Sequence, residues 1–374
     1  MTAQNRLRLL MSADAVGGVW QYAVELAGAL EPLGIDTTLA VLGPSPAEDL
    51  RRFAAGTAPR AAILDTGLPL DWLSGNEAPV LAAGQALAHL AADTGADLVQ
   101  VNSPALAATA AFPVPVVAVA HGCVASWWDA CGDAPFPDSF RWHADLVRRG
   151  LLAADATVAP SAAYAADLAR LYALPERPRA VHNGRGGAPD PAAFAAPAPH
   201  AFSAGRFWDR AKDTATLDAV AARLSAPLRA AGPVEAPHGE RAEPRHLALL
   251  GRLDAPAMAR ELAARPVFVS TARFEPFGLA VLEAAGHGCP LVLADIPVFR
   301  ELWDGAARFA PPGDADAFAA ETNALLADEA VRDRLGRDAA ARAARYAPAA
   351  TAQAMAALYR GLLPAADTQL KVAS

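Results

Sequence analysis

The apolar residues in the first half of the chain form short runs that alternate with amphipathic stretches. Strand-like runs at residues 6–13 and 36–43 flank an amphipathic stretch, VWQYAVELAGAL, at residues 19–30. Further runs of the same kind follow at residues 97–102, 114–122, 155–161 and 179–184. Apolar strands that alternate with helices are typical of a parallel sheet with helices on its faces. We therefore predict an α/β domain over residues 1–185.

The same alternation begins again after a change in composition. Residues 186–200 read GGAPDPAAFAAPAPH, which is too rich in proline for a regular helix and predicts a linker. Strand-like runs return at residues 200–206, 226–232, 246–251, 265–271, 290–295 and 306–311. We predict a second α/β domain over residues 201–345, with a central cleft between the two domains. Residues 346–364 are expected to form a helix that packs back on the first domain, and residues 365–374 a loose tail.

The charge balance narrows the class of partner. The chain has 374 residues, a formal net charge of -8 and a pI near 5.5. Non-specific binding to nucleic acid needs a basic surface, so we expect small-molecule partners and no nucleic acid. Lysine occurs only at positions 212 and 371, so arginine carries nearly all of the positive charge. This scarcity draws attention to Lys212.

The cysteines and the N-terminal residues bear on the compartment. Cys123, Cys131 and Cys289 have neither the spacing of a zinc site nor the even number of a disulfide framework. The first residues, MTAQNRLRLLMSAD, run directly into a strand-like segment and lack the pattern of a signal peptide. We therefore expect a cytoplasmic protein.

One uncharged stretch is long enough to raise the question of a membrane span. Residues 98–128 carry no formally charged side chain. Pro104, Pro113 and Pro115 interrupt the stretch, which reads better as two buried parallel strands joined by a loop. The chain also lacks an evident basic amphipathic segment, so we expect weak peripheral membrane association at most.

The segment RFEPFGLAVLEAAGHGCP, residues 273–290, carries two glutamates in an almost wholly apolar run. Glu275 follows a predicted strand at its carboxyl end, where open α/β sheets bind ligands. The N–H groups of Gly278 and Leu279 begin the next predicted helix and suit a diphosphate. Glu283, a turn inside that helix, is then suited to accept hydrogen bonds from a ribose, and Glu275 to face a sugar hydroxyl. The alternative is that Glu275 caps the helix or favours its dipole, and that Glu283 is an ordinary solvated residue.

Two further loops carry candidate phosphate ligands. SAGRFWDRAKD, residues 203–213, presents Arg206 and Lys212 after a predicted strand, and the two cations could converge on one anion or be surface charges. Gly17 and Gly18 lie between the first predicted strand and helix without GxGxxG spacing, which argues against a dinucleotide-binding dehydrogenase. A plain tight turn is the other interpretation of these glycines.

The spacing within EPFGLAVLEA, together with PLVLADIPVFREL and the PPGD turn, resembles family 4 glycosyltransferases, retaining enzymes of the GT-B fold. The resemblance covers most of the chain and implies two Rossmann-like parallel-sheet domains. In the family's E-x7-E pattern, Glu275 would contact the donor sugar and Glu283 the nucleotide ribose. The resemblance also implies that Arg206 and Lys212 bind the diphosphate. Asp213 stands where the family usually has glycine or asparagine, and this acid could pair with Lys212.

The resemblance gives expectations for residues nearer the N-terminus. In that family a glycine-rich first loop closes over the donor phosphates, which implies this role for Gly17 and Gly18. A histidine at the position of His121 reaches the donor sugar near the reacting centre, whereas a lone histidine is more often a core residue. Trp127 and Trp128 either line the acceptor site or pack in a core.

The sequence VHNGR at residues 181–185 matches the position where the family often reads NGV. Asn183 would then lie at the hinge between the domains as a structural residue. Arg185 replaces an apolar residue of the family pattern.

The resemblance implies a retaining hexosyltransferase that acts on a nucleoside diphosphate sugar (UDP-, GDP- or ADP-sugar) and an acceptor hydroxyl of a sugar or glycan. The role implied for such an enzyme is the synthesis of a glycan, a polysaccharide or a glycoconjugate. No permanently bound cofactor is expected, and metal independence is the family expectation because no DxD-type metal site is evident. The alternatives are a nucleotide-sugar epimerase, a glycan phosphorylase with Lys212 as the cofactor lysine, and a non-catalytic sugar-binding protein on the same fold.

Overall fold

The computed structural model describes residues 6–108, 111–236 and 239–364, and its contacts divide the chain into two compact units. Among the described residues, the first unit holds those up to 120, 145–158 and 351–364, and the second unit holds 121–144 and 159–350. The second unit thus contains residues 121–144 and 159–185, which composition alone assigned to the first domain. The predicted domain limits remain a prediction, and the expected loose tail lies outside the described residues.

The first sheet has seven strands in the order β3-β2-β1-β4-β5-β6-β7. Its strands are β1 (Leu7–Asp14), β2 (Ile35–Leu42), β3 (Ala62–Asp65), β4 (Leu98–Val101), β5 (Val116–Val119), β6 (Ala156–Ala159) and β7 (Arg179–Ala180). The strands from β3 to β6 pair in parallel, for example Leu9 with Thr37 and with Leu98. All residues of β4 and β5 are buried, as expected for the central strands of a sheet covered on both faces.

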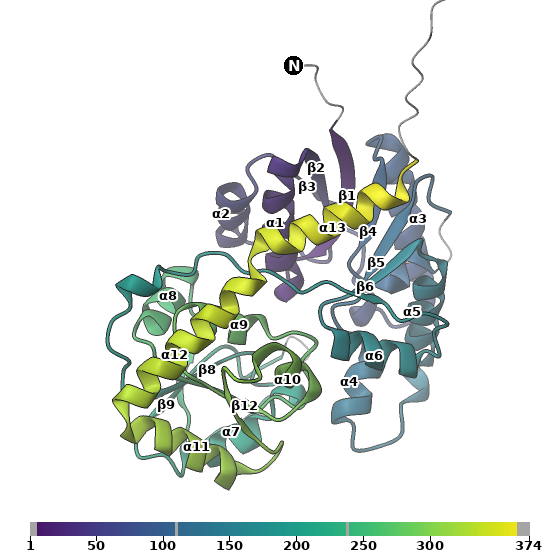
Figure 1. Cartoon of the computed structure of the whole chain (residues 1–374). Helices are drawn as coiled ribbons and strands as arrows, with labels where there is room; N and C mark the ends of the chain where they lie inside the picture. The colour runs from purple at the N-terminus through teal and green to yellow at the C-terminus, as the bar shows by residue number, and fades with distance from the viewer. Residues whose placement is uncertain (1–5, 109–110, 237–238, 365–374) are drawn as a thin grey trace, which may run out of the picture. The chain divides into compact units, whose positions relative to one another are not determined.

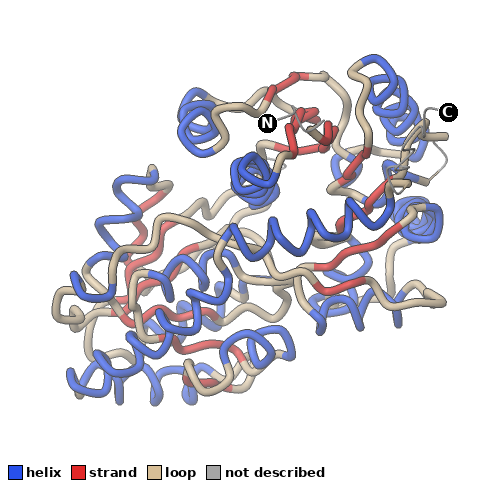
Figure 2. Tube along the Cα trace, turned by 45° about the horizontal axis from the view of Figure 1, so that its top comes forward, coloured by secondary structure: helices blue, strands red, loops and turns tan. Residues whose placement is uncertain are grey.

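Helices cover the strands of the first unit, as Figures 1 and 2 show. They are α1 (Gly18–Leu30), α2 (Glu48–Thr57), α3 (Glu77–Asp93), α5 (Arg141–Ala153) and most of α13 (Pro348–Leu362). The two strands β4 and β5 come from the uncharged stretch at residues 98–128, so the prediction of two buried strands is confirmed. Among the described residues, no helix is long and apolar enough to cross a membrane.

The second sheet has six strands in the order β10-β9-β8-β11-β12-β13, and its registered pairs are parallel. Its strands are β8 (Ala201–Ala204), β9 (Leu228–Ala231), β10 (Ala248–Gly251), β11 (Val267–Ser270), β12 (Leu291–Ala294) and β13 (Arg308–Ala310). The helices of this unit are α4 (Val124–Cys131), α6 (Ala162–Leu171), α7 (Thr214–Ala221), α8 (Ala255–Ala263), α9 (Leu279–Gly286), α10 (Pro297–Trp303), α11 (Ala315–Ala327) and α12 (Glu329–Ala343). The predicted fold class of two Rossmann-like parallel-sheet domains is confirmed.

The last helix is bonded to the centre of the first sheet. Tyr359 of α13 is fully buried and its hydroxyl donates to the side-chain oxygen of Gln100 on β4. The side-chain Nε2 of Gln100 donates to the side-chain Oδ1 of Asn102 at 2.9 Å, and Nδ2 of Asn102 donates to the Ser12 carbonyl of β1 at 2.6 Å. A buried polar network of this kind is satisfied only when each member is present. It therefore joins the end of the described chain to β4 and β1.

Replacement of Tyr359 by phenylalanine is expected to lower the free energy of unfolding by about 1–2 kcal/mol, because the buried oxygen of Gln100 loses a donor. Urea denaturation followed by circular dichroism measures this loss. Arg360 is the control, since it is exposed and donates to the Leu33 carbonyl at 2.6 Å. Arg360→Ala should cost less than about 0.5 kcal/mol. Equal losses for the two variants would contradict a role for the buried network.

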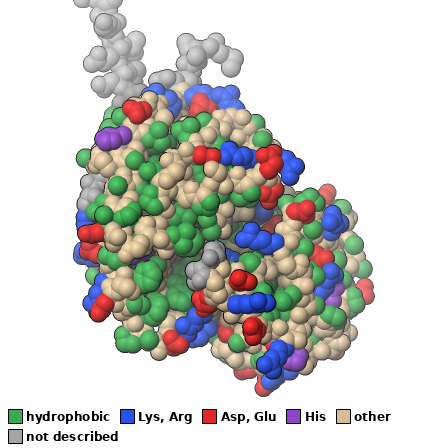
Figure 3. All heavy atoms as spheres, turned by 180° about the vertical axis from the view of Figure 1, so that it is seen from behind, with side chains coloured by type: hydrophobic (Ala, Val, Ile, Leu, Met, Phe, Trp, Pro, Cys, Tyr) green, Lys and Arg blue, Asp and Glu red, His purple; other side chains and the backbone are tan. Residues whose placement is uncertain are grey.

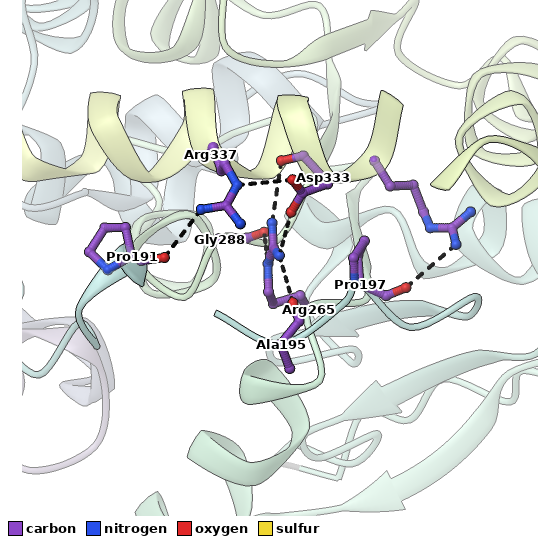
Figure 4. Close-up of polar contacts among 8 residues, drawn as sticks. Pro191, Ala195, Pro197, Arg265, Gly288, Asp333 and Arg337 are labelled. Atoms are coloured by element: carbon purple, nitrogen blue, oxygen red, sulfur yellow. Dashed lines mark hydrogen bonds and ion pairs between the residues drawn. The ribbon is translucent and has the colours of Figure 1, made fainter. Parts of the chain in front are cut away.

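The proline-rich segment at residues 186–200 is held to the second unit by arginines (Figure 4). Arg265 is completely buried, and its guanidinium donates to the carbonyls of Ala195 at 2.7 Å and Gly288 at 3.0 Å. It also forms an ion pair with Asp333 of α12 at 2.7 Å. Hydrogen bonds from Arg337 and Arg265 lower the pKa of Asp333 below its ordinary value. The segment is therefore fixed to α12 and to the loop before β12.

An aromatic contact completes this attachment. The Arg265 guanidinium lies 4.8 Å from the ring centroid of Phe194 in the same segment. Gly288 has a φ of +73°, and a Cβ added there would lie 2.5 Å from the Phe194 ring. Only glycine meets both demands, since the left-handed conformation and the lack of space each disfavour a side chain. Arg337 adds a bond to the Pro191 carbonyl at 3.2 Å, and Arg332 one to the Pro197 carbonyl at 3.4 Å.

Candidate active site

A pocket in the second unit opens at the carboxyl ends of β8 and β11, two strands that are adjacent in the sheet. The strand order reverses between these strands, because β9 and β10 lie on one side and β12 and β13 on the other. Open α/β sheets bind ligands at such a switch point. The pocket is lined by Ser203, Ala204, Phe207, Lys212, Phe268, Ser270, Thr271, Glu275, Gly278, Ala280 and Val281. It thus brings together Lys212, Glu275 and Gly278, which the sequence singled out separately.

Lys212 and Glu275 form an ion pair in this pocket, and each keeps about a fifth of its side chain exposed (22% and 18%). The two loops that carry them are joined through the backbone. The Thr271 hydroxyl donates to the Lys212 carbonyl at 2.9 Å, and the Arg273 N–H donates to the Ala211 carbonyl at 2.8 Å. The pair therefore presents a cation and a carboxylate side by side, with part of each open to a ligand.

The pairing of Asp213 with Lys212 that the sequence left open is not seen among the described residues, because Asp213 has a different role. It is the N-cap of α7, and its carboxylate accepts from the Thr216 N–H at 3.3 Å and the Thr216 hydroxyl at 2.8 Å. Its φ of +48° and ψ of 56° lie in the left-handed region. Glycine, asparagine and aspartate are the residues that adopt this conformation most readily. Aspartate at this position can therefore adopt the left-handed backbone conformation that glycine or asparagine would adopt. Lys212 pairs with Glu275 instead of with Asp213.

Gly278 is the N-cap of α9, with a φ of +94°. A Cβ added there would lie 3.0 Å from the Phe299 ring and 3.3 Å from Cγ of Glu275. No side chain among the described residues caps the start of α9, so Glu275 is not the helix cap that the alternative interpretation suggested. The N–H groups of the first turn of a helix have no carbonyl partner within it. Leu282 is the first residue of α9 whose N–H has one, since it donates to the Gly278 carbonyl at 3.0 Å. The N–H groups of Leu279 and the two residues after it are therefore suited to bind an anion.

Glu283 forms an ion pair that sequence reasoning missed. Arg185 Nη2 lies 3.3 Å from Glu283 Oε1, and the two side chains are 18% and 28% exposed. From the sequence, Arg185 was noticed only because it replaces an apolar residue of the family pattern. The sequence did not predict that Glu283 is its partner. Glu283 is thus held by a cation, rather than free in solvent as the alternative interpretation had it.

Arg206 does not line the pocket, and its Nη2 donates to Oδ2 of Asp209 at 3.0 Å. Its guanidinium also lies 5.5 Å from the ring centroid of Trp208, and 47% of the side chain is exposed. The structure therefore does not bring Arg206 and Lys212 onto one point. Asp209, which sequence reasoning did not single out, holds Arg206 in this position.

His121 lies two residues after the end of β5 and is partly buried. Burial lowers its pKa to about 3, so the imidazole is neutral near pH 7 and is suited to hydrogen bonding rather than to charge. Its neighbour Gly122 lies beside the Glu275 loop, since a Cβ added at Gly122 would lie 3.7 Å from the Pro276 ring. The position of His121 is compatible with the predicted contact to a donor sugar, and that role remains a prediction.

Gly17 and Gly18 lie in the first unit at the start of α1. The Asp14 carboxylate accepts from the N–H groups of Val16 at 3.0 Å and Gly17 at 3.3 Å, which fixes this loop as a turn. Asp14 thus shapes the loop, although the sequence did not single it out. The predicted role of the two glycines at the donor phosphates remains a prediction.

Asn183 is buried in the second unit, and its neighbour His182 contacts a carboxylate that the sequence did not single out, Glu301. Glu301 of α10 pairs with His182 at 2.9 Å and accepts from the N–H groups of Ala162 and Ala163 at the start of α6. Burial raises the pKa of Glu301, but the hydrogen bonds from His182 and the two N–H groups lower it further, so the pKa lies below its ordinary value. Glu301 therefore remains charged and joins α10 to α6.

The described residues contain no group of three or more histidine, cysteine or acidic side chains that could hold a metal ion. On the face shown in Figure 3, acidic and basic side chains are interspersed over both parts of the molecule.

Comparison with known proteins gives two family models that match successive parts of the chain. Residues 16–185 match the model described as Glycosyltransferase Family 4, and residues 198–328 match Glycosyl transferases group 1. Together the two models cover most of the sequence. A comparison with the sequences of curated proteins gives no match.

Solved structures with the same fold span nearly the whole chain. A sucrose-phosphate synthase from Thermosynechococcus elongatus is 21% identical with a TM-score of 0.76, and the match covers 96% of this chain and 99% of that one. HepE from Anabaena, solved in complex with UDP-glucose, is 18% identical with a TM-score of 0.71 over 96% and 100% of the two chains. A glycosyltransferase from Rickettsia africae is 14% identical with a TM-score of 0.68 over 96% and 99%. These likenesses show the GT-B fold.

Proposed function

The chain belongs to the family 4 glycosyltransferases of the GT-B fold, and from this premise we propose that it transfers a hexosyl group from a nucleoside diphosphate sugar to an acceptor hydroxyl with retention of configuration. The observation that carries the proposal is the pocket at the ends of β8 and β11, which joins Lys212, Glu275 and the start of α9. A cation, a carboxylate and unpaired N–H groups are the set that a sugar diphosphate requires.

In this proposal the N–H groups at the start of α9 and the Lys212 ammonium bind the diphosphate. Glu275 accepts hydrogen bonds from the hydroxyls of the sugar, and Glu283 from those of the ribose. When the bond between the anomeric carbon and the diphosphate oxygen breaks, negative charge develops on the leaving group. Cations and N–H groups already in place stabilise that charge without reorganisation.

The acceptor oxygen then bonds to the anomeric carbon from the same face, and its proton passes to an oxygen of the departing diphosphate. The products are a glycoside and a nucleoside diphosphate. The ion pair between Lys212 and Glu275 must loosen when the donor binds, because both partners exchange a bond to each other for bonds to the donor. Its partial exposure keeps the cost of that exchange small.

The acceptor in this proposal is a sugar or glycan hydroxyl, and the reaction takes place in the cytoplasm without a metal ion. Three observations are compatible with these parts of the proposal: the mixed charges on the face shown in Figure 3, the three free cysteines and the neutral His121, whose neighbour Gly122 lies beside the Glu275 loop. HepE was solved with UDP-glucose, so UDP-glucose is the first donor to test.

A donor panel tests the proposal. The protein is heated with UDP-, GDP- and ADP-glucose and with the free diphosphates, in buffer that contains EDTA. One base is expected to stabilise it, by about 2.7 kcal/mol at a ligand concentration of 100 Kd. The same donor with a sugar acceptor should then release the nucleoside diphosphate. An isomerised donor would indicate an epimerase, a requirement for inorganic phosphate a phosphorylase, and binding without turnover a sugar-binding protein.

A further inference from the structure

Asp209 is a nearly buried carboxylate in the loop that carries both cations of the proposed donor site. Its side chain is 8% exposed and accepts three hydrogen bonds. Oδ1 accepts from the indole Nε1 of Trp127 at 2.8 Å and from the Ala211 N–H at 3.0 Å. Oδ2 accepts from Nη2 of Arg206 at 3.0 Å. One carboxylate thus joins an aromatic side chain, a backbone turn and a guanidinium.

The donors of these bonds come from two separate segments of the second unit. Trp127 lies on α4, whereas Arg206 follows β8 and Ala211 lies in a short 3-10 helix, Arg210–Lys212. A second contact joins the same two segments, because Arg210 pairs with Asp133 at 2.8 Å just after α4. The α4 segment therefore holds the Arg206–Lys212 loop at two points.

The orientation of Arg206 depends on this arrangement. A guanidinium is planar, so a carboxylate bound to one of its nitrogens fixes the direction in which the other donors point. About half of the Arg206 side chain is exposed, which leaves donors free for a ligand. The carboxylate is itself fixed by the Trp127 N–H and the Ala211 N–H, since each oxygen of a buried carboxylate needs donors. Loss of the indole N–H would leave Oδ1 with the Ala211 N–H alone among these three donors.

We propose that Asp209 and Trp127 are positioning residues of the donor site: Asp209 aims the Arg206 guanidinium at the donor diphosphate, and Trp127 holds Asp209 through its indole N–H. This inference rests on the proposed function. It gives Arg206 a phosphate role although its side chain does not line the pocket. It also assigns Trp127 a task performed by its N–H, whereas an acceptor platform would use the face of the ring.

The test compares Trp127→Phe with Trp128→Phe in the full chain. Trp127→Phe keeps a ring and removes the N–H to Asp209. Trp128→Phe is the matched control, because the Trp128 N–H donates to the Ala134 carbonyl at 2.8 Å and not to Asp209. The readouts are the Kd of the nucleoside diphosphate that stabilises the protein among UDP, GDP and ADP, measured by calorimetry, and the KM of the corresponding sugar donor.

Trp127→Phe should raise the Kd and the donor KM by about 5-fold with the acceptor KM unchanged, and Trp128→Phe should leave the Kd within about 2-fold. Asp209→Asn should raise the Kd by about 10-fold or more, because the Arg206 guanidinium loses its charged partner. Since Trp127 acts through Asp209, the double variant should bind no more weakly than Asp209→Asn alone. The melting temperature of each variant is measured to separate folding from positioning.

Three results would overturn the proposal. The first is a rise in the acceptor KM of Trp127→Phe at constant donor KM, which is the result for an acceptor platform. The second is additive losses in the double variant. The third is a lower melting temperature at unchanged Kd, which is the result for a purely structural contact. A wild-type protein that binds a nucleoside diphosphate but transfers no sugar would count against the proposed function alone, because the Kd comparison still reports on the two positioning residues.

Discussion

Glu275→Gln is expected to lower kcat/KM for glycosyl transfer by at least about 100-fold, or about 2.7 kcal/mol of transition-state stabilisation. The amide keeps the size of the side chain but removes its charge. Lys212 then loses its partner in the pocket, and the sugar hydroxyls lose a charged acceptor. Release of nucleoside diphosphate in the presence of acceptor measures the effect.

Two further glutamates serve as comparisons. Glu283→Gln should act mainly on the donor KM, because a ribose contact is equally present in the ground state and the transition state. Glu321→Gln should leave both constants unchanged, since Glu321 on α11 is partly exposed and lies 4.0 Å from its partner Arg308. Acceptor-dependent turnover of Glu275→Gln within about 3-fold of the wild-type value would refute the site assignment.

Arg265→Met is expected to lower the free energy of unfolding by about 2–4 kcal/mol, because it removes a completely buried guanidinium that bonds two backbone carbonyls and Asp333. Methionine fills a similar volume, but the carbonyls of Ala195 and Gly288 lose their donor (Figure 4). The expected fall in melting temperature is about 10 °C. Residues 186–200 should also become open to limited proteolysis, since the guanidinium that holds them is gone.

Arg337→Met is the matched control for this prediction. Its side chain is 49% exposed and it pairs with the same residue, Asp333, at 2.9 Å. A surface ion pair of this kind contributes about 0–1 kcal/mol. The two variants are compared by thermal unfolding and by limited proteolysis. Equal melting temperatures and equal digestion rates would contradict the assigned role of Arg265.

The fold could be predicted because each strand of a parallel sheet leaves a recognisable pattern in a short stretch of sequence. Strands covered on both faces are continuous apolar runs, as at β4 and β5, and each run is bounded by residues that favour turns. The position of Glu275 and Gly278 could be predicted in the same way, because both follow a strand-like run and ligand loops lie at the carboxyl ends of such strands. Both residues line the pocket at the carboxyl ends of β8 and β11. The meeting of Glu275 with Lys212 needed only the adjacency of β8 and β11.

The rest depended on contacts between distant residues that no local pattern encodes. The sequence left open a pairing of Asp213 with Lys212, yet Asp213 has a left-handed backbone and caps α7. Arg185 was noted as an oddity, and its partner Glu283 lies 98 residues further on. In the sequence, Asp209 cannot be distinguished from a surface aspartate. Only the structure shows that its carboxylate accepts from the Trp127 indole of α4.

The bond between Tyr359 and Gln100 also orders events during synthesis of the protein. The two residues are 259 positions apart, and Met355 and Ala356 of α13 are buried together with Tyr359. A ribosome releases β4 long before α13, so Gln100 meets this partner only after synthesis has passed Tyr359. The strands of the second unit are all available earlier. Synthesis of the first unit therefore begins before that of the second and ends after it. A nascent chain that stalls before α13 would carry a complete second unit and a first unit that lacks its last helix.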